Sequence, residues 1–69
     1  MRLSARNVLK GKIKQVKAGA VNSEVVIQIA PGVEVVAIIT KESADGLQLA
    51  NGKDAYAVIK ASNVMIAVD

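Results

Sequence analysis

The sequence contains no cysteine, no histidine, no tryptophan and no phenylalanine. Without cysteine there is no disulfide, and without cysteine or histidine there is no zinc site of the kind that stabilises small domains. No nucleophile and base can be paired from the remaining residues, so we predict that the chain is not an enzyme. We also expect no cofactor and no directly coordinated metal ion.

Aromatic side chains are almost absent, since Tyr56 is the only one. Proteins that bind single-stranded nucleic acid stack bases on aromatic rings, at about 1–3 kcal/mol per base. We therefore expect no nucleic-acid partner, although Lys10, Lys12 and Lys14 alternate along a predicted strand. This stripe is either a solvated face that discourages edge-to-edge association or a nucleic-acid track. We favour the solvated face, and a steep salt dependence of oligonucleotide binding would favour the track.

Long apolar runs are also missing. No run approaches the ~18 residues that a membrane span requires, and Met1-Arg2-Leu3 leads directly into polar residues without the pattern of a signal peptide. We therefore expect a cytoplasmic protein with no membrane contact.

The chain has 69 residues, of which 52% are apolar, and a net charge of +3. A chain of this length forms one domain, residues 1–69, and buries only about 60% of its unfolded surface when it is alone. The many small aliphatic side chains must therefore be covered by something other than the chain's own core. We expect association of identical chains.

Short extended segments dominate the pattern. Strands are predicted at residues 9–16, 21–29, 33–39, 54–60 and 64–68, and Thr40 is a plausible N-cap for a short helix over residues 41–47. Three strands, a helix and two strands indicate an all-β chain with one short helix, folded as a five-stranded Greek-key barrel of the OB type.

The strand at residues 33–39 loses the apolar/polar alternation in its second half, so both of its faces should be covered. One interpretation is that this strand lies at a subunit interface, because one small domain cannot cover both faces. The alternative is a central strand of a small closed barrel with small residues on its outer face.

Three short motifs together resemble one known family. Ser4-Ala5-Arg6-Asn7, Ile39-Thr40-Lys41-Glu42-Ser43 and the stretch from Val58 to Met65 look like the signature of the molbindins. These are the small molybdenum-pterin-binding or Mop proteins, whose domain also occurs as the transport-associated OB module of oxyanion importers. The resemblance covers nearly the whole chain.

The resemblance implies a cytoplasmic binder of molybdate, and also of tungstate, that acts in storage or homeostasis. It further implies a homohexamer built as a trimer of dimers, with the oxyanion between subunits. Carried over position by position, the implied ligand-binding residues are Ser4, Ala5, Arg6, Thr40, Ser43, Lys60 and Ala61. Ala61 stands where some relatives have serine, so only its backbone N–H could contribute.

The chemistry of these residues agrees with that ligand. Molybdate is a fully deprotonated tetrahedral dianion at neutral pH, so its site should contain hydrogen-bond donors only. Arg6 and Lys60 supply charge, Ser4, Thr40 and Ser43 supply hydroxyls, and no carboxylate belongs to the set. Two other functions stay open: a molybdate-sensing accessory subunit that docks on another protein, and a nucleic-acid-binding OB module.

Overall fold

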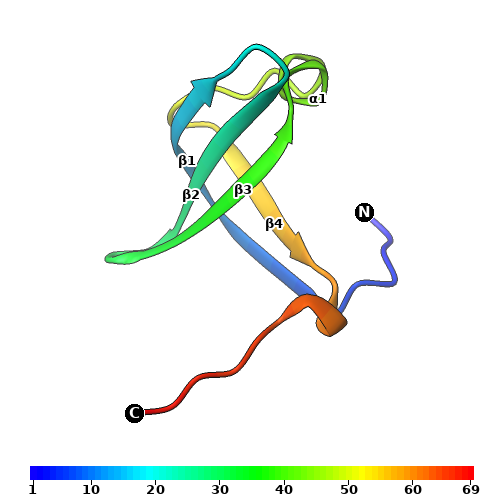
Figure 1. Cartoon of the computed structure of the whole chain (residues 1–69), viewed down its shortest axis with the longest axis vertical. Helices are drawn as coiled ribbons and strands as arrows, with labels where there is room; N and C mark the ends of the chain where they lie inside the picture. The colour runs from blue at the N-terminus through cyan, green and yellow to red at the C-terminus, as the bar shows by residue number, and fades with distance from the viewer.

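The computed structural model describes residues 1–69 as one curled, four-stranded antiparallel sheet with a short helix at one end (Figure 1). The strands follow the order β3-β2-β1-β4 across the sheet. The elements in chain order are β1 (Asn7–Ala18), β2 (Asn22–Ala30), β3 (Val33–Thr40), α1 (Lys41–Gly46), β4 (Asp54–Ile59) and the 3₁₀ turn η1 (Ala61–Asn63). The predicted all-β class with one short helix is confirmed, and so are four of the five predicted strands.

The long strand β1 joins the two halves of the sheet. Its first half pairs with β4, from Asn7 opposite Ile59 to Lys12 opposite Asp54, and its second half pairs with β2. A β-bulge inserts Lys14 between Ile13 and Gln15, which face consecutive residues of β2. A bulge bends its strand and increases the twist, which curls the sheet. The lysines at 10, 12 and 14 alternate in the sequence, but position 16 is the apolar Val16. The extra residue explains this break in the alternation.

The predicted fifth strand at residues 64–68 is wrong for the isolated chain. After Val64, whose N–H donates to Ala61 O at 3.3 Å, no residue makes a backbone hydrogen bond, and the 64–69 segment runs away from the sheet (Figure 1). The apolar, β-branched pattern indicates burial within a sheet, but it does not specify which chain supplies that sheet. Because β3 and β4 are not paired with each other, the barrel is open.

The helix α1 begins where the sequence predicts it. Thr40 has extended backbone angles, and its Oγ1 accepts a hydrogen bond from the Ser43 N–H at 3.0 Å, as an N-cap does. The helix ends at Gly46, and Gln48 then adopts a left-handed φ of 54°. α1 has six residues, and the chain has no helix with the length and apolar character to cross a bilayer.

The lysine stripe of β1 is partly neutralised by carboxylates of β4 and β3. Lys12 Nζ lies 2.7 Å from Asp54 Oδ1 on β4, and Lys14 pairs with Glu34 on β3. The hydrogen bond from Lys12 and the positive charge of its ammonium group lower the pKa of the Asp54 carboxyl group. Cross-strand ion pairs of this kind fit the solvated face better than a continuous nucleic-acid track.

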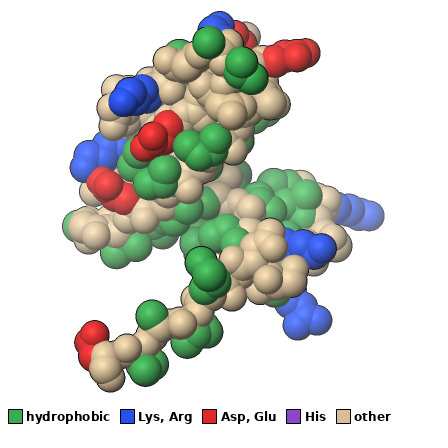
Figure 2. Space-filling view, viewed as in Figure 1, with side chains coloured by type: hydrophobic (Ala, Val, Ile, Leu, Met, Phe, Trp, Pro, Cys, Tyr) green, Lys and Arg blue, Asp and Glu red, His purple; other side chains and the backbone are tan.

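The core is small, and much apolar surface is exposed. Only seven of the 69 residues are buried, and Ile13, Val25, Ile27 and Ala57 form the central cluster. β3 is an edge strand of the sheet. The alternative interpretation of residues 33–39, as the central strand of a small closed barrel, is therefore wrong. Its outer face exposes large apolar side chains, and Figure 2 shows further hydrophobic groups along the projecting 64–69 segment. An isolated soluble chain rarely exposes this much contiguous apolar surface.

Gly11 allows β1 and β2 to approach closely, so a side chain at this position should destabilise the fold. A Cβ at this position would lie 2.4 Å from Gln28 O and 2.8 Å from Ile27 Cγ2. We expect Gly11→Ala to lower the free energy of unfolding by about 1–3 kcal/mol, as overpacking does. Urea denaturation at fixed protein concentration measures the change.

Gly46→Ala is the matched control, because a Cβ at Gly46 meets no atom within 4 Å. Gly46 closes α1, where alanine is the better helix former by about 1 kcal/mol. Equal urea midpoints for the two variants would show that the close contacts at Gly11 do not affect the free energy of unfolding.

Candidate anion-binding site

The first and third motifs meet at one end of the sheet. Asn7, the first residue of β1, pairs with Ile59, the last residue of β4, and Asn7 Nδ2 donates to Ile59 O at 3.2 Å. Arg6 immediately precedes β1 and Lys60 immediately follows β4, so extending the antiparallel register by one position places the two residues opposite each other. The residues Ser4, Ala5, Arg6, Lys60 and Ala61 are called the basic group below.

The basic group offers donors that nothing in the chain uses. Neither Arg6 nor Lys60 takes part in an ion pair, and both residues are exposed. The backbone N–H groups of Ser4, Ala5 and Ala61 donate to no acceptor within the chain. Two unpaired cations beside free amides are the elements of a site for an oxyanion.

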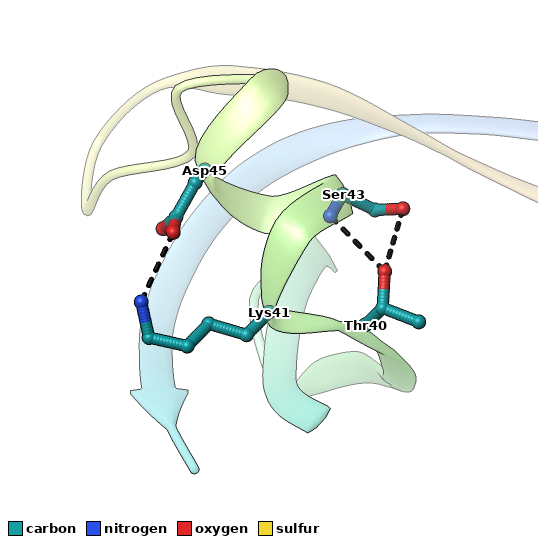
Figure 3. Close-up of polar contacts among 4 residues, drawn as sticks. All are labelled: Thr40, Lys41, Ser43 and Asp45. Atoms are coloured by element: carbon teal, nitrogen blue, oxygen red, sulfur yellow. Dashed lines mark hydrogen bonds and ion pairs between the residues drawn. The ribbon is translucent and has the colours of Figure 1, made fainter. Parts of the chain in front are cut away.

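The middle motif supplies two hydroxyl groups at the start of α1 (Figure 3). Thr40 Oγ1 donates its proton to Ser43 Oγ at 2.8 Å and accepts from the Ser43 N–H. The single hydroxyl proton of Thr40 is therefore used within the chain, whereas the hydroxyl proton of Ser43 is free to reach a ligand. Thr40 and Ser43 are called the hydroxyl pair below.

The Asp45 carboxylate of α1 does not point at the hydroxyl pair. Lys41 Nζ holds Asp45 Oδ2 at 3.0 Å on the other side of the helix, as Figure 3 shows. A shallow hollow on that side is lined by Lys41, Glu42 and Asp45, among others. Two carboxylates make this hollow unsuitable for a dianion, because like charges repel.

The basic group and the hydroxyl pair lie at opposite ends of the molecule. The basic group adjoins Asn7, where β1 starts, while Thr40 pairs with Asn22 beside the far end of β1. β1 has 12 residues, and a strand rises about 3.3 Å per residue. Figure 1 shows α1 at the top and the chain around η1 far below it, with only the 64–69 segment extending further down the longest axis, which spans 35 Å for the whole molecule. One chain cannot close both groups around one tetrahedral ion.

Asn7 is not among the ligand-binding residues that the resemblance implies, but it holds together the strand ends beside two of them. Its side chain connects β1 to β4 by a hydrogen bond at the ends of the two strands, next to Arg6 and Lys60. The sequence offered one signal for this role: Asn7 belongs to the same short motif as Arg6. The spacing of the residues could not show that its partner is a carbonyl 52 residues away.

Comparison with known proteins agrees with the resemblance. The TOBE domain family matches residues 3–66. The chain is 48% identical over 66 residues to molybdenum-pterin-binding protein 3 of Clostridium pasteurianum, an alignment that covers 96% of this chain and 97% of that protein.

Two solved structures have the same fold. A molybdate-binding protein from Sporomusa ovata superposes with a TM-score of 0.91 at 32% identity, over 99% of this chain and 100% of that one. The cytoplasmic molybdate-binding protein ModG, solved with molybdate bound, gives a TM-score of 0.89 at 49% identity, over 94% of this chain and 46% of that chain. The chain therefore belongs to the TOBE domain family and, within it, to the small molybdenum-pterin-binding proteins.

Proposed function

We propose that this protein binds molybdate, and also tungstate, as a tetrahedral dianion held between copies of the chain by hydrogen-bond donors alone. One observation carries the proposal: the register of β1 and β4 brings Arg6 and Lys60 together with unused backbone N–H groups. The donor set contains no carboxylate, which suits a ligand that can only accept. The names of the relatives support molybdate as that ligand.

The donor inventory is large enough for useful affinity. Charge-assisted hydrogen bonds contribute about 1.5–3 kcal/mol each and neutral ones about 0.5–1.5 kcal/mol. Two of the first kind and four of the second give roughly 5–12 kcal/mol before the cost of ordering the groups. Micromolar affinity corresponds to about 8 kcal/mol, which lies within this range.

The site should also discriminate between oxyanions. Phosphate near neutral pH keeps at least one proton, and a pocket of donors leaves that proton without an acceptor. Sulfate is deprotonated like molybdate but smaller, so only the dimensions of the closed pocket can exclude it.

The complete site requires more than one copy. The basic group and the hydroxyl pair are too far apart in one chain to contact the same ion. The exposed apolar surface is unfavourable in water unless another chain buries it. A homohexamer arranged as a trimer of dimers, as the resemblance implies, would meet both needs. In the cytoplasm such an assembly would store or buffer molybdate.

The test is calorimetric titration of the purified protein with molybdate, tungstate, sulfate and phosphate, together with native mass spectrometry. We expect heat with molybdate at about one ion per chain, little heat with phosphate, and a mass that is a multiple of the single chain. A monomer that binds no molybdate would refute the proposal.

Binding should be nearly independent of pH between about 6 and 8 on the protein side. The chain has no histidine, the side chain whose charge most often changes in this window. The one shifted group, Asp54, has a lowered pKa and stays ionised throughout. We expect the dissociation constant for molybdate to change less than about twofold. A tenfold change measured by calorimetry would contradict the donor list.

A further inference from the structure

Asn7 is a polar residue at a position that the strand pattern assigns to the core. Side chains alternate between the two faces of a strand, so Asn7 shares a face of β1 with Leu9, Gly11 and Ile13. Ile13 belongs to the core cluster, and Asn7 itself is half-buried. Asparagine is depleted in strands. A residue that breaks a local rule in this way is expected where function, rather than folding, requires it.

The Asn7 side chain makes the one side-chain hydrogen bond at this end of the sheet. Its Nδ2 donates to Ile59 O at 3.2 Å, across 52 positions of sequence. No other side chain of residues 1–11 or 55–69 takes part in a hydrogen bond or ion pair within the chain. The accepting carbonyl belongs to the same planar peptide group as the Lys60 N–H. The bond therefore holds the peptide group that leads into Lys60.

Beyond this hydrogen bond the two chain segments separate. Arg6 lies outside the sheet, and Lys60 leads into η1. Figure 1 shows the chain before β1 and the chain after η1 leaving the sheet in different directions. Strand ends held by few contacts open readily. The Asn7–Ile59 bond is the last side-chain tie before the segments that carry Arg6 and Lys60 part.

We propose that Asn7 is a positioning residue of the anion site, which sets the separation of Arg6 and Lys60 and thereby the size of the oxyanion that both can hold. The inference rests on the proposed function for the identity of the ligand. Arginine and lysine side chains have many rotamers and adjust to ions of several sizes when their backbones are free to move. A second residue that fixes those backbones removes part of this freedom.

A fixed separation favours the larger of two tetrahedral ions. Donors placed for molybdate lie too far from the oxygens of the smaller sulfate ion, and hydrogen bonds weaken beyond about 3.2 Å. Donor chemistry alone does not separate the two dianions, because both are fully deprotonated and can only accept. Asn7 therefore supplies, from within the chain, part of the rigidity that selection by size requires.

Asn7→Leu tests the inference, because leucine has a similar volume and no hydrogen-bond donor. Leucine beside Ile59 keeps an apolar cross-strand contact that is not directional, so the free energy of unfolding in urea should stay unchanged. We expect the affinity for molybdate to fall about 3- to 10-fold, as the loss of one hydrogen bond does, and the affinity for sulfate to fall less. Calorimetric titration with both ions measures the ratio of the two dissociation constants. A ratio equal to that of the wild type would overturn the proposal.

Two further variants separate the donor from a general loosening of the strand pair. Asn7→Gln keeps the donor on a longer side chain and should recover part of the lost selectivity; no recovery would count against the donor. The matched control is Lys12→Gln with Asp54→Asn, which removes the ion pair at the other end of the β1–β4 pairing and leaves the net charge unchanged. Both dissociation constants should stay the same in this control. A loss of selectivity equal to that in Asn7→Leu would refute the assignment.

A disulfide measures the positioning without any ligand, and the absence of cysteine leaves no background. Arg6→Cys with Lys60→Cys should close a disulfide within one chain, because residues opposite each other in antiparallel strands meet the limit of about 7 Å between Cα atoms. In a glutathione buffer, adding Asn7→Leu should lower the equilibrium constant of this disulfide about 3- to 10-fold. The Lys12 and Asp54 control should not change it. Mass spectra of the denatured, unreduced protein identify the disulfide within a single chain.

The two measurements separate this inference from the proposed function. A wild-type protein that binds no molybdate refutes the proposed function, and the disulfide constant still decides whether Asn7 positions the two segments. A wild-type protein that binds molybdate, with a selectivity that Asn7→Leu leaves unchanged, refutes the inference and leaves the proposed function standing. An unchanged disulfide constant in Asn7→Leu would refute the inference in either case.

Discussion

Arg6→Ala is expected to weaken molybdate binding by about 2–4 kcal/mol, or roughly 30- to 1,000-fold in the dissociation constant. The substitution removes a fixed charge with paired donors from the proposed site, which associated copies of the chain would cover. The fold should not change, because Arg6 is exposed, precedes β1 and makes no hydrogen bond or ion pair within the chain. Calorimetric titration measures the affinity, and circular dichroism and native mass confirm that the assembly is intact.

Arg2→Ala is the control for general electrostatic attraction. Arg2 is also exposed and unpaired, and it lies four positions before Arg6 in the same leading segment. Its removal lowers the net charge equally, so we expect less than about a threefold loss of affinity. Arg6→Lys should be intermediate, because lysine keeps the charge but loses the planar fork. Equal losses in Arg2→Ala and Arg6→Ala would remove Arg6 from the site.

The local elements could be predicted because local rules decide them. Thr40 caps α1 as expected, and Asn51-Gly52 forms a turn in which Gly52 takes a positive φ of 85°. The strands were found within one to two residues at most ends, since β-branched runs interrupted by Pro31-Gly32 leave few alternatives. The break in alternation at Val16 marked the bulge, although the sequence alone did not identify its cause.

The fifth strand shows where such reasoning stops. The composition of residues 64–68 correctly indicates a need for burial, yet no residue in the stretch specifies the edge against which it pairs. Strand pairing across 50 residues or more depends on the whole sheet, and pairing with another chain depends on a surface outside this chain. The isolated chain therefore leaves exposed a segment that the sequence marks as buried.

The candidate site divides in the same way. The type of each residue predicted a donor-only set, but the spacing could not show which residues meet. The β1–β4 register unites Arg6 with Lys60, which are 54 positions apart, whereas Thr40 and Ser43 fall at the opposite end. One resemblance to a family thus named all these residues, and the fold places them in two groups at opposite ends of the chain.

That division predicts complementation between two defective chains. Arg6→Ala disables the basic group, and Ser43→Asp places a carboxylate where the free hydroxyl proton would face the dianion. Ser43 is exposed and lies in the first turn of α1, where an acidic residue is tolerated. Each variant alone should bind little molybdate at a concentration that saturates the wild type. Random co-assembly of equal amounts should restore about a quarter of the sites, because an intact basic group then meets an intact hydroxyl pair from another chain.

Wild type co-assembled with the double variant, Arg6→Ala with Ser43→Asp, is the control that decides between the two arrangements. If each site takes its two groups from different chains, this mixture also shows about a quarter of the wild-type sites. If one chain supplied both groups, the control would show about half of the sites and the two single variants together would show none. Molybdate bound per chain, measured by equilibrium dialysis on the tagged mixed assemblies, separates these outcomes. Because both mixtures contain the same number of substitutions, any difference between them reflects only whether the two groups belong to one chain or to two.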